Sequence, residues 1–249
     1  MRPSMASSAW SSYPSDLPYT MAEKDTLYFE LLDALQAGGC ALCGLARKAS
    51  DSYLNALLYE GVTDVPVRDE LRNARGPCYR HAWQMVDKRG SVLGTAVIYR
   101  DIVNTLAKAL QQDADAPRRW RGYREALARR LAPSTGCPAC TLEQNAERRS
   151  AKTLLKHLDS AEVAAAYAAA GGLCLPHFQV VLSHAGEEAT RTLAQWQEGA
   201  LCRLRDELDE LIRKHDYRFR GEPTTEEEAV SWRRAVAAAV GEPKPVNRE

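Results

Sequence analysis

The spacing of six cysteines and two histidines constrains this chain more than any other feature of its sequence. A CxxC motif is followed, after 34 intervening residues, by a CxxH motif, and the same pair of motifs recurs with 33 intervening residues. The motif residues are Cys40, Cys43, Cys78 and His81 in the first copy and Cys137, Cys140, Cys174 and His177 in the second. We interpret this pattern as an internal duplication of a unit of about a hundred residues.

The residues around the motifs also correspond. Gly39 and Gly136 precede the two CxxC motifs, and Gly76 and Gly172 stand two positions before the two CxxH motifs. At these residues the chain resembles a family of uncharacterised bacterial proteins with paired CxxC and CxxH motifs. The resemblance covers most of Thr26 to Lys214, and it implies no particular activity.

The pattern between the motifs predicts an all-α protein made of two homologous helical repeats. Asp25 or Thr26 can cap a first helix, and each CxxC and CxxH motif then opens a further helix. No segment shows the alternation of apolar and polar residues that is typical of a strand. We therefore expect each repeat to place a Cys3His metal site at the N-termini of its helices.

The predicted organisation has four segments. Residues 1–24 are expected to be disordered, because they are rich in serine and proline. Residues 25–115 and 116–216 form the first and second repeat units. Residues 217–249 form an appended helix and a tail, with the helix capped by Thr224 or Thr225.

Two long helices carry apolar stripes. In the first unit the stripe consists of Leu93, Ala96, Val97, Val103, Leu106 and Leu110. In the second unit, over residues 187–214, it consists of Leu193, Trp196, Ala200, Leu204, Leu208 and Leu211. We expect the second stripe to pack on the protein's own core, with a homodimer through residues 187–214 as the alternative.

Cysteine pairs at helix starts can direct their sulfurs to one point, and two motifs together can enclose a cation tetrahedrally. We predict about two Zn²⁺ ions per chain, one for each Cys3His set, with iron-sulfur clusters as the alternative. A pairing of each CxxC with the CxxH of its own unit is simpler, because the shorter loop costs less entropy to close. Buried structural cysteines and dithiol chemistry at Cys137 and Cys140 are the weaker interpretations.

Glu60 and His157 occupy corresponding positions, each seventeen residues after the second cysteine of its CxxC motif. If the units pack about a pseudo-twofold axis, these two side chains could act as base and acid in a shared cleft. The alternative is an ordinary pair of residues at helix ends. Tyr59 and Asp64 are secondary candidates, for a hydrogen bond to the site or a helix cap.

Composition narrows the choice of partners. The chain has 33 basic and 33 acidic side chains, so no net charge draws it to nucleic acid or to an anionic membrane. A local basic cluster around Trp120, from Arg118 to Arg130, is better explained as a solvated face. No apolar run has the length of a membrane span, and we expect a cytoplasmic protein.

The sequence thus favours a metal-binding structural or interaction module whose partner is an unidentified protein or small molecule. The alternative is an iron-sulfur or zinc enzyme that uses Glu60 and His157.

Overall fold

The computed structural model describes residues 24–111, 122–219 and 221–242, and within these ranges it contains helices and no strand. The prediction of an all-α protein is confirmed. The helices are α1 (Thr26–Gln36), α2 (Ala41–Tyr59), α3 (Val65–Ala74), α4 (Tyr79–Val86), α5 (Ser91–Gln111), α6 (Tyr123–Leu131), α7 (Pro138–Lys156), α8 (Ala161–Ala170), α9 (Leu175–Leu182), α10 (Glu187–Lys214) and α11 (Glu226–Val240), with a 3-10 turn at Tyr217–Phe219. The predicted disordered segment 1–24 lies, apart from Lys24, outside the described residues.

Helices of equal length follow the two copies of the motifs. The CxxC helices α2 and α7 each have 19 residues, the next helices α3 and α8 each have 10, and the CxxH helices α4 and α9 each have 8. A long helix, α5 or α10, completes each series. The order of helices therefore agrees with the duplication inferred from the motifs.

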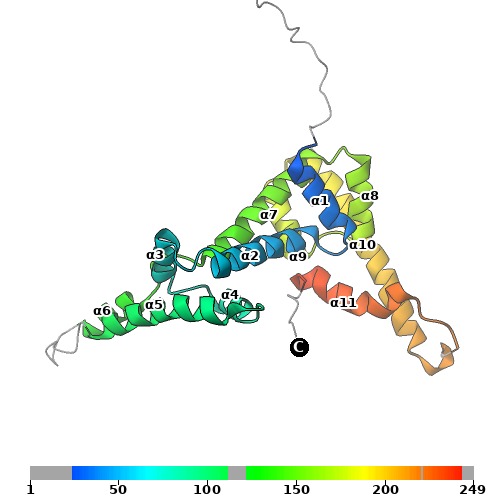
Figure 1. The fold of residues 1–249 in the computed structure, drawn as a ribbon. Coiled ribbons are helices and arrows are strands. Elements are labelled where there is room, and N and C mark those ends of the chain that lie inside the picture. The colour runs from blue at the N-terminus through cyan, green and yellow to red at the C-terminus, as the bar shows by residue number, and fades with distance from the viewer. Residues whose placement is uncertain (1–23, 112–121, 220, 243–249) are drawn as a thin grey trace, which may run out of the picture.

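The two CxxC helices form the centre of the molecule. In Figure 1, α2 and α7 lie against each other and run in opposite chain directions. One arm, made of α4, α5 and α6, extends from this pair toward the left, and a second arm, made of α10 and α11, extends toward the right. The start of each CxxC helix is thereby brought beside the helices of the opposite unit.

Two apolar clusters stabilise this arrangement, one toward each end of α2. The larger cluster joins α1, α2, α7 and α8, with Tyr28, Leu42, Leu154 and Tyr167 fully buried. The smaller cluster joins the end of α2 to α3, α4 and α5. Each fully buried leucine or tyrosine of this kind contributes roughly 1.5–3 kcal/mol relative to an exposed position.

Short polar side chains begin several of the helices, as the sequence predicts. Asp25 accepts a hydrogen bond from the backbone N–H of Tyr28, and Ser160 and Asp64 cap α8 and α3 in the same way. Thr225 begins α11 with a reciprocal capping box. Such caps satisfy backbone donors that the first helical turn leaves unpaired.

The predicted apolar face of α5 is wrong. Leu93 and Val103 are 76% and 59% exposed, whereas Gly94, Ile98 and Ile102 face the core. A Cβ atom at Gly94 would lie 2.9 Å from Leu58 Cδ2, so the glycine allows α5 to approach α2 closely. The periodicity of apolar residues does not reveal this face, because a glycine forms the contact between α5 and α2.

The stripe on α10 does pack within the chain, since Leu193, Ala200 and Leu204 are buried. Within the described ranges, no single helix combines the length and apolar character of a membrane crossing. Helices α1 and α2 satisfy that criterion only as a pair bent by 114°. The part of the predicted basic cluster from Arg118 to Arg121 lies outside the described residues.

Candidate metal centres

The eight motif residues gather into two groups, each with three sulfurs and one imidazole. Site A consists of Cys40, Cys43, Cys174 and His177, and site B consists of Cys78, His81, Cys137 and Cys140. In each group the ligand atoms all lie within 4.8 Å of one another. The seven cysteines of the chain, including Cys202, are all free thiols.

Each site combines motifs from different units, so the expected pairing of each CxxC with its own CxxH is wrong. Site A joins the first CxxC to the second CxxH, and site B joins the first CxxH to the second CxxC. The cause is the opposite direction of α2 and α7, which carries the start of each helix to the other unit. The loop from Cys43 to Cys174 spans 131 positions, whereas 34 residues separate the two motifs of the first unit. The entropy lost on closing the longer loop raises the free energy by only about 1.2 kcal/mol more. Burial of the α2–α7 contact offsets this amount easily.

The distances within both sites suit one tetrahedral cation. The His81 Nδ1 atom lies 3.4 Å from the sulfurs of Cys78 and Cys140 and 3.5 Å from that of Cys137. In site A the corresponding distances from His177 Nδ1 are 3.2–3.4 Å, to Cys174, Cys43 and Cys40. A tetrahedral zinc ion, with Zn–S of about 2.3 Å and Zn–N of about 2.0 Å, places its donors about 3.5–3.8 Å apart. The Cys78–Cys140 and Cys43–Cys174 sulfur distances of 3.5 and 3.8 Å agree with this geometry.

Helix starts place these ligands. The first cysteine of every motif is the N-cap residue of its helix, and none of the four forms a side-chain cap hydrogen bond. The second ligand of every motif is therefore the third helical residue, on the same face as the cap. Because helix N-termini carry partial positive charge, each pair of helices stabilises the negative charge of three thiolates.

Two carboxylates that sequence reasoning missed orient the histidines. The His81 Nε2 atom lies 3.0 Å from Glu143 Oε1, and His177 Nε2 lies 3.3 Å from Glu147 Oε1. Both glutamates lie on α7, one turn apart. A carboxylate on the outer nitrogen keeps the proton there and leaves Nδ1 free to bind a metal. Arg80, which follows Tyr79 at the start of α4, also pairs with Glu143.

The protonation of site B indicates how a cation would stabilise three neighbouring thiolates. Burial raises the pKa of Cys140 to about 12, and the neighbouring Cys78 and Cys137 sulfurs act in the same direction. Burial also acts to raise the pKa of Cys137, but hydrogen bonds from His81 and from backbone N–H groups outweigh it and lower the pKa to about 6. One sulfur is thus readily ionised while its neighbour resists ionisation. A bound cation removes this conflict.

The backbone that leads into Cys174 is held by one side chain of α10. The buried Gln197 accepts a hydrogen bond from the Leu173 N–H at 3.0 Å and donates one to the Leu173 carbonyl at 2.9 Å. The Tyr167 hydroxyl donates to the same amide. A Cβ atom at Gly172, which has a φ of 83°, would lie 2.8 Å from Gln197 Oε1. The glycine therefore permits the close approach that positions Cys174.

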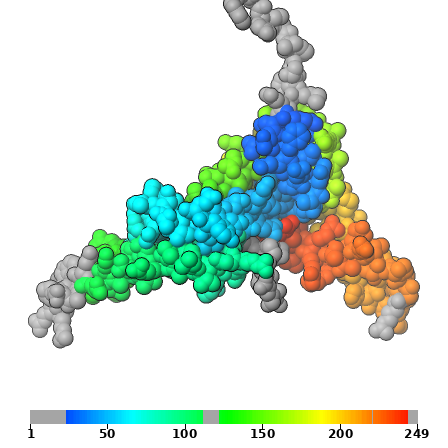
Figure 2. Space-filling model, viewed as in Figure 1, coloured from blue at the N-terminus to red at the C-terminus, as the bar shows by residue number. Residues whose placement is uncertain are grey.

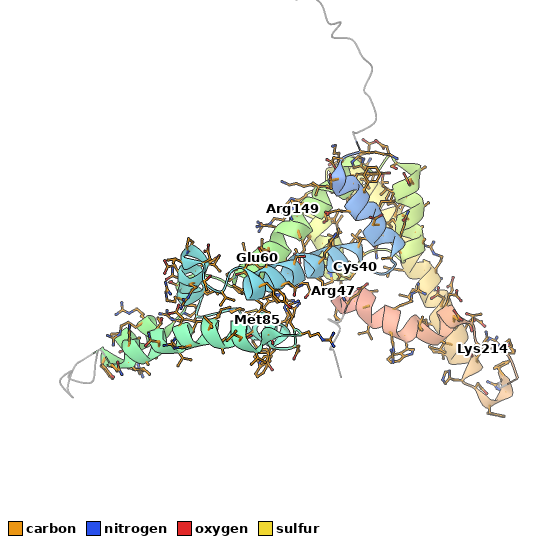
Figure 3. All side chains as sticks on the ribbon, in the orientation of Figure 1. Cys40, Arg47, Glu60, Met85, Arg149 and Lys214 are labelled. Atoms are coloured by element: carbon orange, nitrogen blue, oxygen red, sulfur yellow. The ribbon has the colours of Figure 1, made fainter. Side chains whose placement is uncertain are left out.

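Glu60 and His157 lie at the ends of different helices. Glu60 is the exposed residue that ends α2, and Figure 3 shows it at the opposite end of this helix from Cys40. His157 ends α7, is 5% exposed, and packs against Tyr28 with ring centroids 4.7 Å apart and ring planes tilted by 59°. Burial lowers the pKa of His157. No interaction of the described residues joins this pair, and its predicted role in catalysis remains a prediction.

The secondary candidates Tyr59 and Asp64 lie outside both sites, as do His215 and Cys202. Asp64 caps α3, and the Tyr59 hydroxyl donates to the Arg89 carbonyl at 3.4 Å. His215 ends α10, with its Nδ1 atom 2.8 Å from the Leu211 carbonyl oxygen. Cys202 is half-buried on α10. These positions agree with structural roles.

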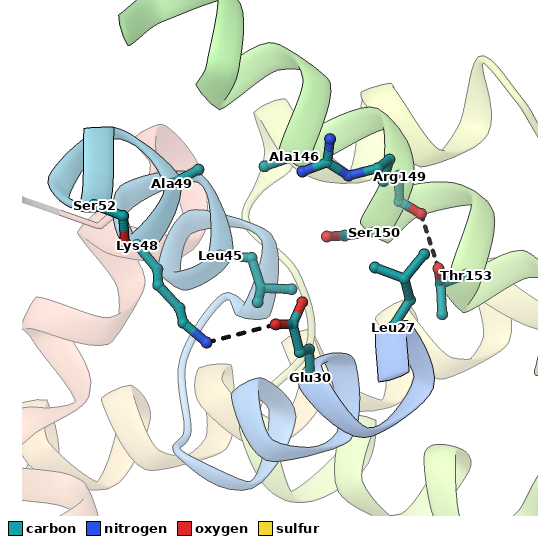
Figure 4. A pocket seen from close by; sticks show the side chains of 10 residues that line it. All are labelled: Leu27, Glu30, Leu45, Lys48, Ala49, Ser52, Ala146, Arg149, Ser150 and Thr153. Atoms are coloured by element: carbon teal, nitrogen blue, oxygen red, sulfur yellow. Dashed lines mark hydrogen bonds and ion pairs between the residues drawn. The ribbon is translucent and has the colours of Figure 1, made fainter. Parts of the chain in front are cut away.

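A polar cavity of about 180 Å³ lies between α1, α2 and α7 (Figure 4). Lys48 pairs there with Glu30 at 3.7 Å, and the Thr153 hydroxyl donates to the Arg149 carbonyl. Leu27, Leu45 and Ala146 line its apolar part. The cavity contains no ligand of either site and neither Glu60 nor His157.

Comparisons with known proteins agree with the resemblance noted in the sequence. A family model described as "Family of unknown function (DUF6062)" matches residues 23–244. An "Uncharacterized 23.9 kDa protein in xynA 3'region" of Caldicellulosiruptor sp. (strain Rt8B.4) is 26% identical over 213 residues, which cover 85% of this chain and 99% of the relative. No solved structure matches the chain.

Proposed function

This chain belongs to the DUF6062 family, whose description assigns no function, and we propose that it is a zinc-binding scaffold in which two Zn²⁺ ions tie two helical units together. Each ion has a Cys3His ligand set, and each set draws on both units. The metal contributes folding free energy, and the surfaces that it holds in place serve for interaction with a partner.

One observation carries this proposal: both quartets are assembled across the units, with donor atoms at the spacing of one tetrahedral ion. All four positions are filled by side chains, which is typical of structural zinc and leaves no open position for a substrate. The carboxylates of Glu143 and Glu147 complete the arrangement that zinc-bound histidines ordinarily show. These features favour a structural role over an enzymatic one.

The same distances favour zinc over an iron-sulfur cluster. A cluster inserts several iron and sulfide atoms between its protein ligands, so the ligands must stand farther apart than around one ion. Here the sulfurs of Cys78 and Cys140 are 3.5 Å apart, and those of Cys43 and Cys174 are 3.8 Å apart. A single ion with thiolate and imidazole ligands is the better fit, and zinc is the common ion for such sets.

Exposed apolar side chains on one arm support an interaction role. Tyr79, Trp83 and Val86 of α4 and Val92 and Leu93 at the start of α5 are all exposed. Tyr79 and Trp83 contact each other edge to face, with centroids 6.4 Å apart. Exposed aromatic side chains that contact each other, such as Tyr79 and Trp83, are typical of protein interaction sites. Because Tyr79 follows the site B ligand Cys78 directly, metal binding at site B would order this surface.

Elemental analysis and optical spectroscopy of anaerobically purified protein test the proposal. We expect a colourless protein with about two zinc ions per chain, one for each four-ligand site. A brown protein with broad visible absorption and acid-labile sulfide would favour the cluster. A protein that binds neither metal nor cluster, even when refolded with Zn²⁺, would contradict the proposal. The motif cysteines would then be explained as buried structural residues. Sedimentation of the zinc-loaded protein reports whether α10 also forms a homodimer.

A further inference from the structure

The two sites differ in how completely the chain encloses their sulfurs. In site A, Cys40 and Cys174 are 6% and 1% exposed, and Cys43 is half-buried. In site B the histidine is buried, but Cys78, Cys137 and Cys140 are all half-buried. Solvent and small solutes therefore reach more sulfur at site B.

The residues that follow α11 account for the closure of site A. Oε1 of Glu242 accepts a hydrogen bond of 2.7 Å from the backbone N–H of Cys40, and Oε2 forms an ion pair of 2.8 Å with Arg47. A Cβ atom at Gly241 would stand 3.7 and 3.9 Å from the sulfurs of Cys43 and Cys174. Figures 2 and 3 show the end of α11 against the start of α2, beside Arg47. We call Gly241 and Glu242 the C-terminal strap.

A glycine at the edge of site A leaves space for this strap. A Cβ atom at Gly39, which has a φ of 72°, would stand 1.9 Å from Glu242 Oε1. Only a residue without a side chain leaves room for the carboxylate beside the Cys40 N–H. The contact thus involves the backbone, a salt bridge and a glycine, and it is more than a chance approach of the C-terminal region.

Site B lacks an equivalent cover among the described residues. The helix that follows α5 is α6, and its C-terminal carbonyl groups, of Arg130 and Leu131, accept hydrogen bonds from Arg75 at the end of α3. Figure 1 shows α6 at the far end of the arm from α4. Helix α6 follows α5 as α11 follows α10, but it lies away from site B.

We propose that the strap makes site A a retentive metal site and leaves site B as the exchangeable one, where an incoming thiolate or chelating ligand displaces protein sulfur. This inference rests on the proposed zinc function. Ligand exchange needs an approaching donor to reach the ion or its sulfurs, and among the described residues Glu242 and Gly241 restrict that approach at site A and not at site B. The chain would then hold one permanent zinc ion and one that responds to metal supply.

Zinc release from the full-length, zinc-loaded protein tests the inference. The protein is mixed with the chromophoric chelator 4-(2-pyridylazo)resorcinol and with iodoacetamide, and mass spectrometry then reads alkylation at each cysteine. We expect two phases of release, with alkylation of Cys78, Cys137 and Cys140 in the fast phase and of Cys40, Cys43 and Cys174 in the slow phase. Glu242→Ala should accelerate the slow phase by about tenfold or more, because hydrogen bonds and ion pairs of a charged group are among the stronger ones.

A matched control is Glu222→Ala, which removes a different carboxylate–arginine pair from the C-terminal region, that with Arg213. It should leave both phases unchanged. Equal alkylation of the two cysteine sets in the wild type, or a slow phase that Glu242→Ala leaves unaltered, would overturn the inference. So would an equal acceleration at site B. Failure of the zinc function itself is recognised separately, since the purified protein would then contain no zinc before the chelator is added.

Discussion

At the scale of single residues, the ligands are found from sequence but their supports are not. Six cysteines and two histidines at repeated spacing are unusual enough to predict a metal site. Glu143 and Glu147 are two of many acidic residues on helices, and nothing in the motif spacing distinguishes them. They become recognisable only when His81 and His177 are seen to present their outer nitrogens to α7.

Each of these glutamates should act on one site only. Glu143→Gln is expected to weaken zinc binding at site B by about 10- to 100-fold, because a neutral amide oxygen is a weaker acceptor than the carboxylate that fixes the tautomer of the histidine. Glu147→Gln should do the same at site A, with a smaller effect because Glu147 is more exposed than Glu143. Competition with a chelator, read separately at each site through cysteine alkylation, measures both. Weakening of both sites by either variant would contradict the assignment.

The positions of Glu60 and His157 predict that substitutions at the two residues differ in their effect on stability. His157→Ala removes a buried ring that packs against Tyr28 and should lower the free energy of unfolding by roughly 1–3 kcal/mol. Glu60→Ala, at an exposed helix end, should change it by less than about 0.5 kcal/mol. Urea denaturation measures both. If His157→Ala unfolds with wild-type stability, its burial has no structural role and the catalytic prediction gains weight.

At the scale of the elements, helix starts were predictable and helix faces were less so. Local chemistry decides a start, and Asp25 and Thr225 cap the helices expected of them. A face depends on the partner helix. On α5 the contact is made through Gly94, a residue that carries no hydrophobic signal, whereas Leu93 and Leu110 remain exposed.

The link between α10 and site A gives a prediction at this scale. Gln197→Met keeps the size of the side chain but removes its hydrogen bonds to Leu173 and Tyr167, leaving buried polar groups unpaired. We expect a loss of about 2–4 kcal/mol in the free energy of unfolding, since each unsatisfied group costs about 1–3 kcal/mol. Zinc affinity should fall at site A and stay constant at site B.

The matched control is Gln195→Met, an identical change at an exposed position of the same helix. Its thermal midpoint and zinc content should equal those of the wild type. A Gln197→Met variant as stable as this control would show that the amide does not position the loop before Cys174.

At the scale of the whole molecule, the duplication predicts two sites but not their pairing. A preference for the shorter loop favours ligands from one unit, yet the entropy of loop closure grows only logarithmically with length. The orientation of α2 against α7 decides the outcome, and the packing of the larger apolar cluster sets that orientation. Tertiary contacts of this range are not encoded in motif spacing.

Cross-unit pairing would give each bound metal ion a structural role that a within-unit site lacks. Site A ties the start of α2 to α9, and site B ties the start of α7 to α4. Loss of either ion should therefore loosen the contact between the units as well as the local fold.

The central claim is tested most directly by the zinc content of two double variants, measured by native mass spectrometry. Cys43→Ser with Cys174→Ser alters site A alone in this structure and should leave about one zinc ion per chain, since one complete four-ligand set remains. Cys43→Ser with Cys78→Ser alters both sites and should leave no tightly bound zinc, with Cys202→Ser as a control that retains the wild-type content. The reverse result, with zinc lost from the first double variant and half retained by the second, would show that each unit binds its own metal and would contradict the account.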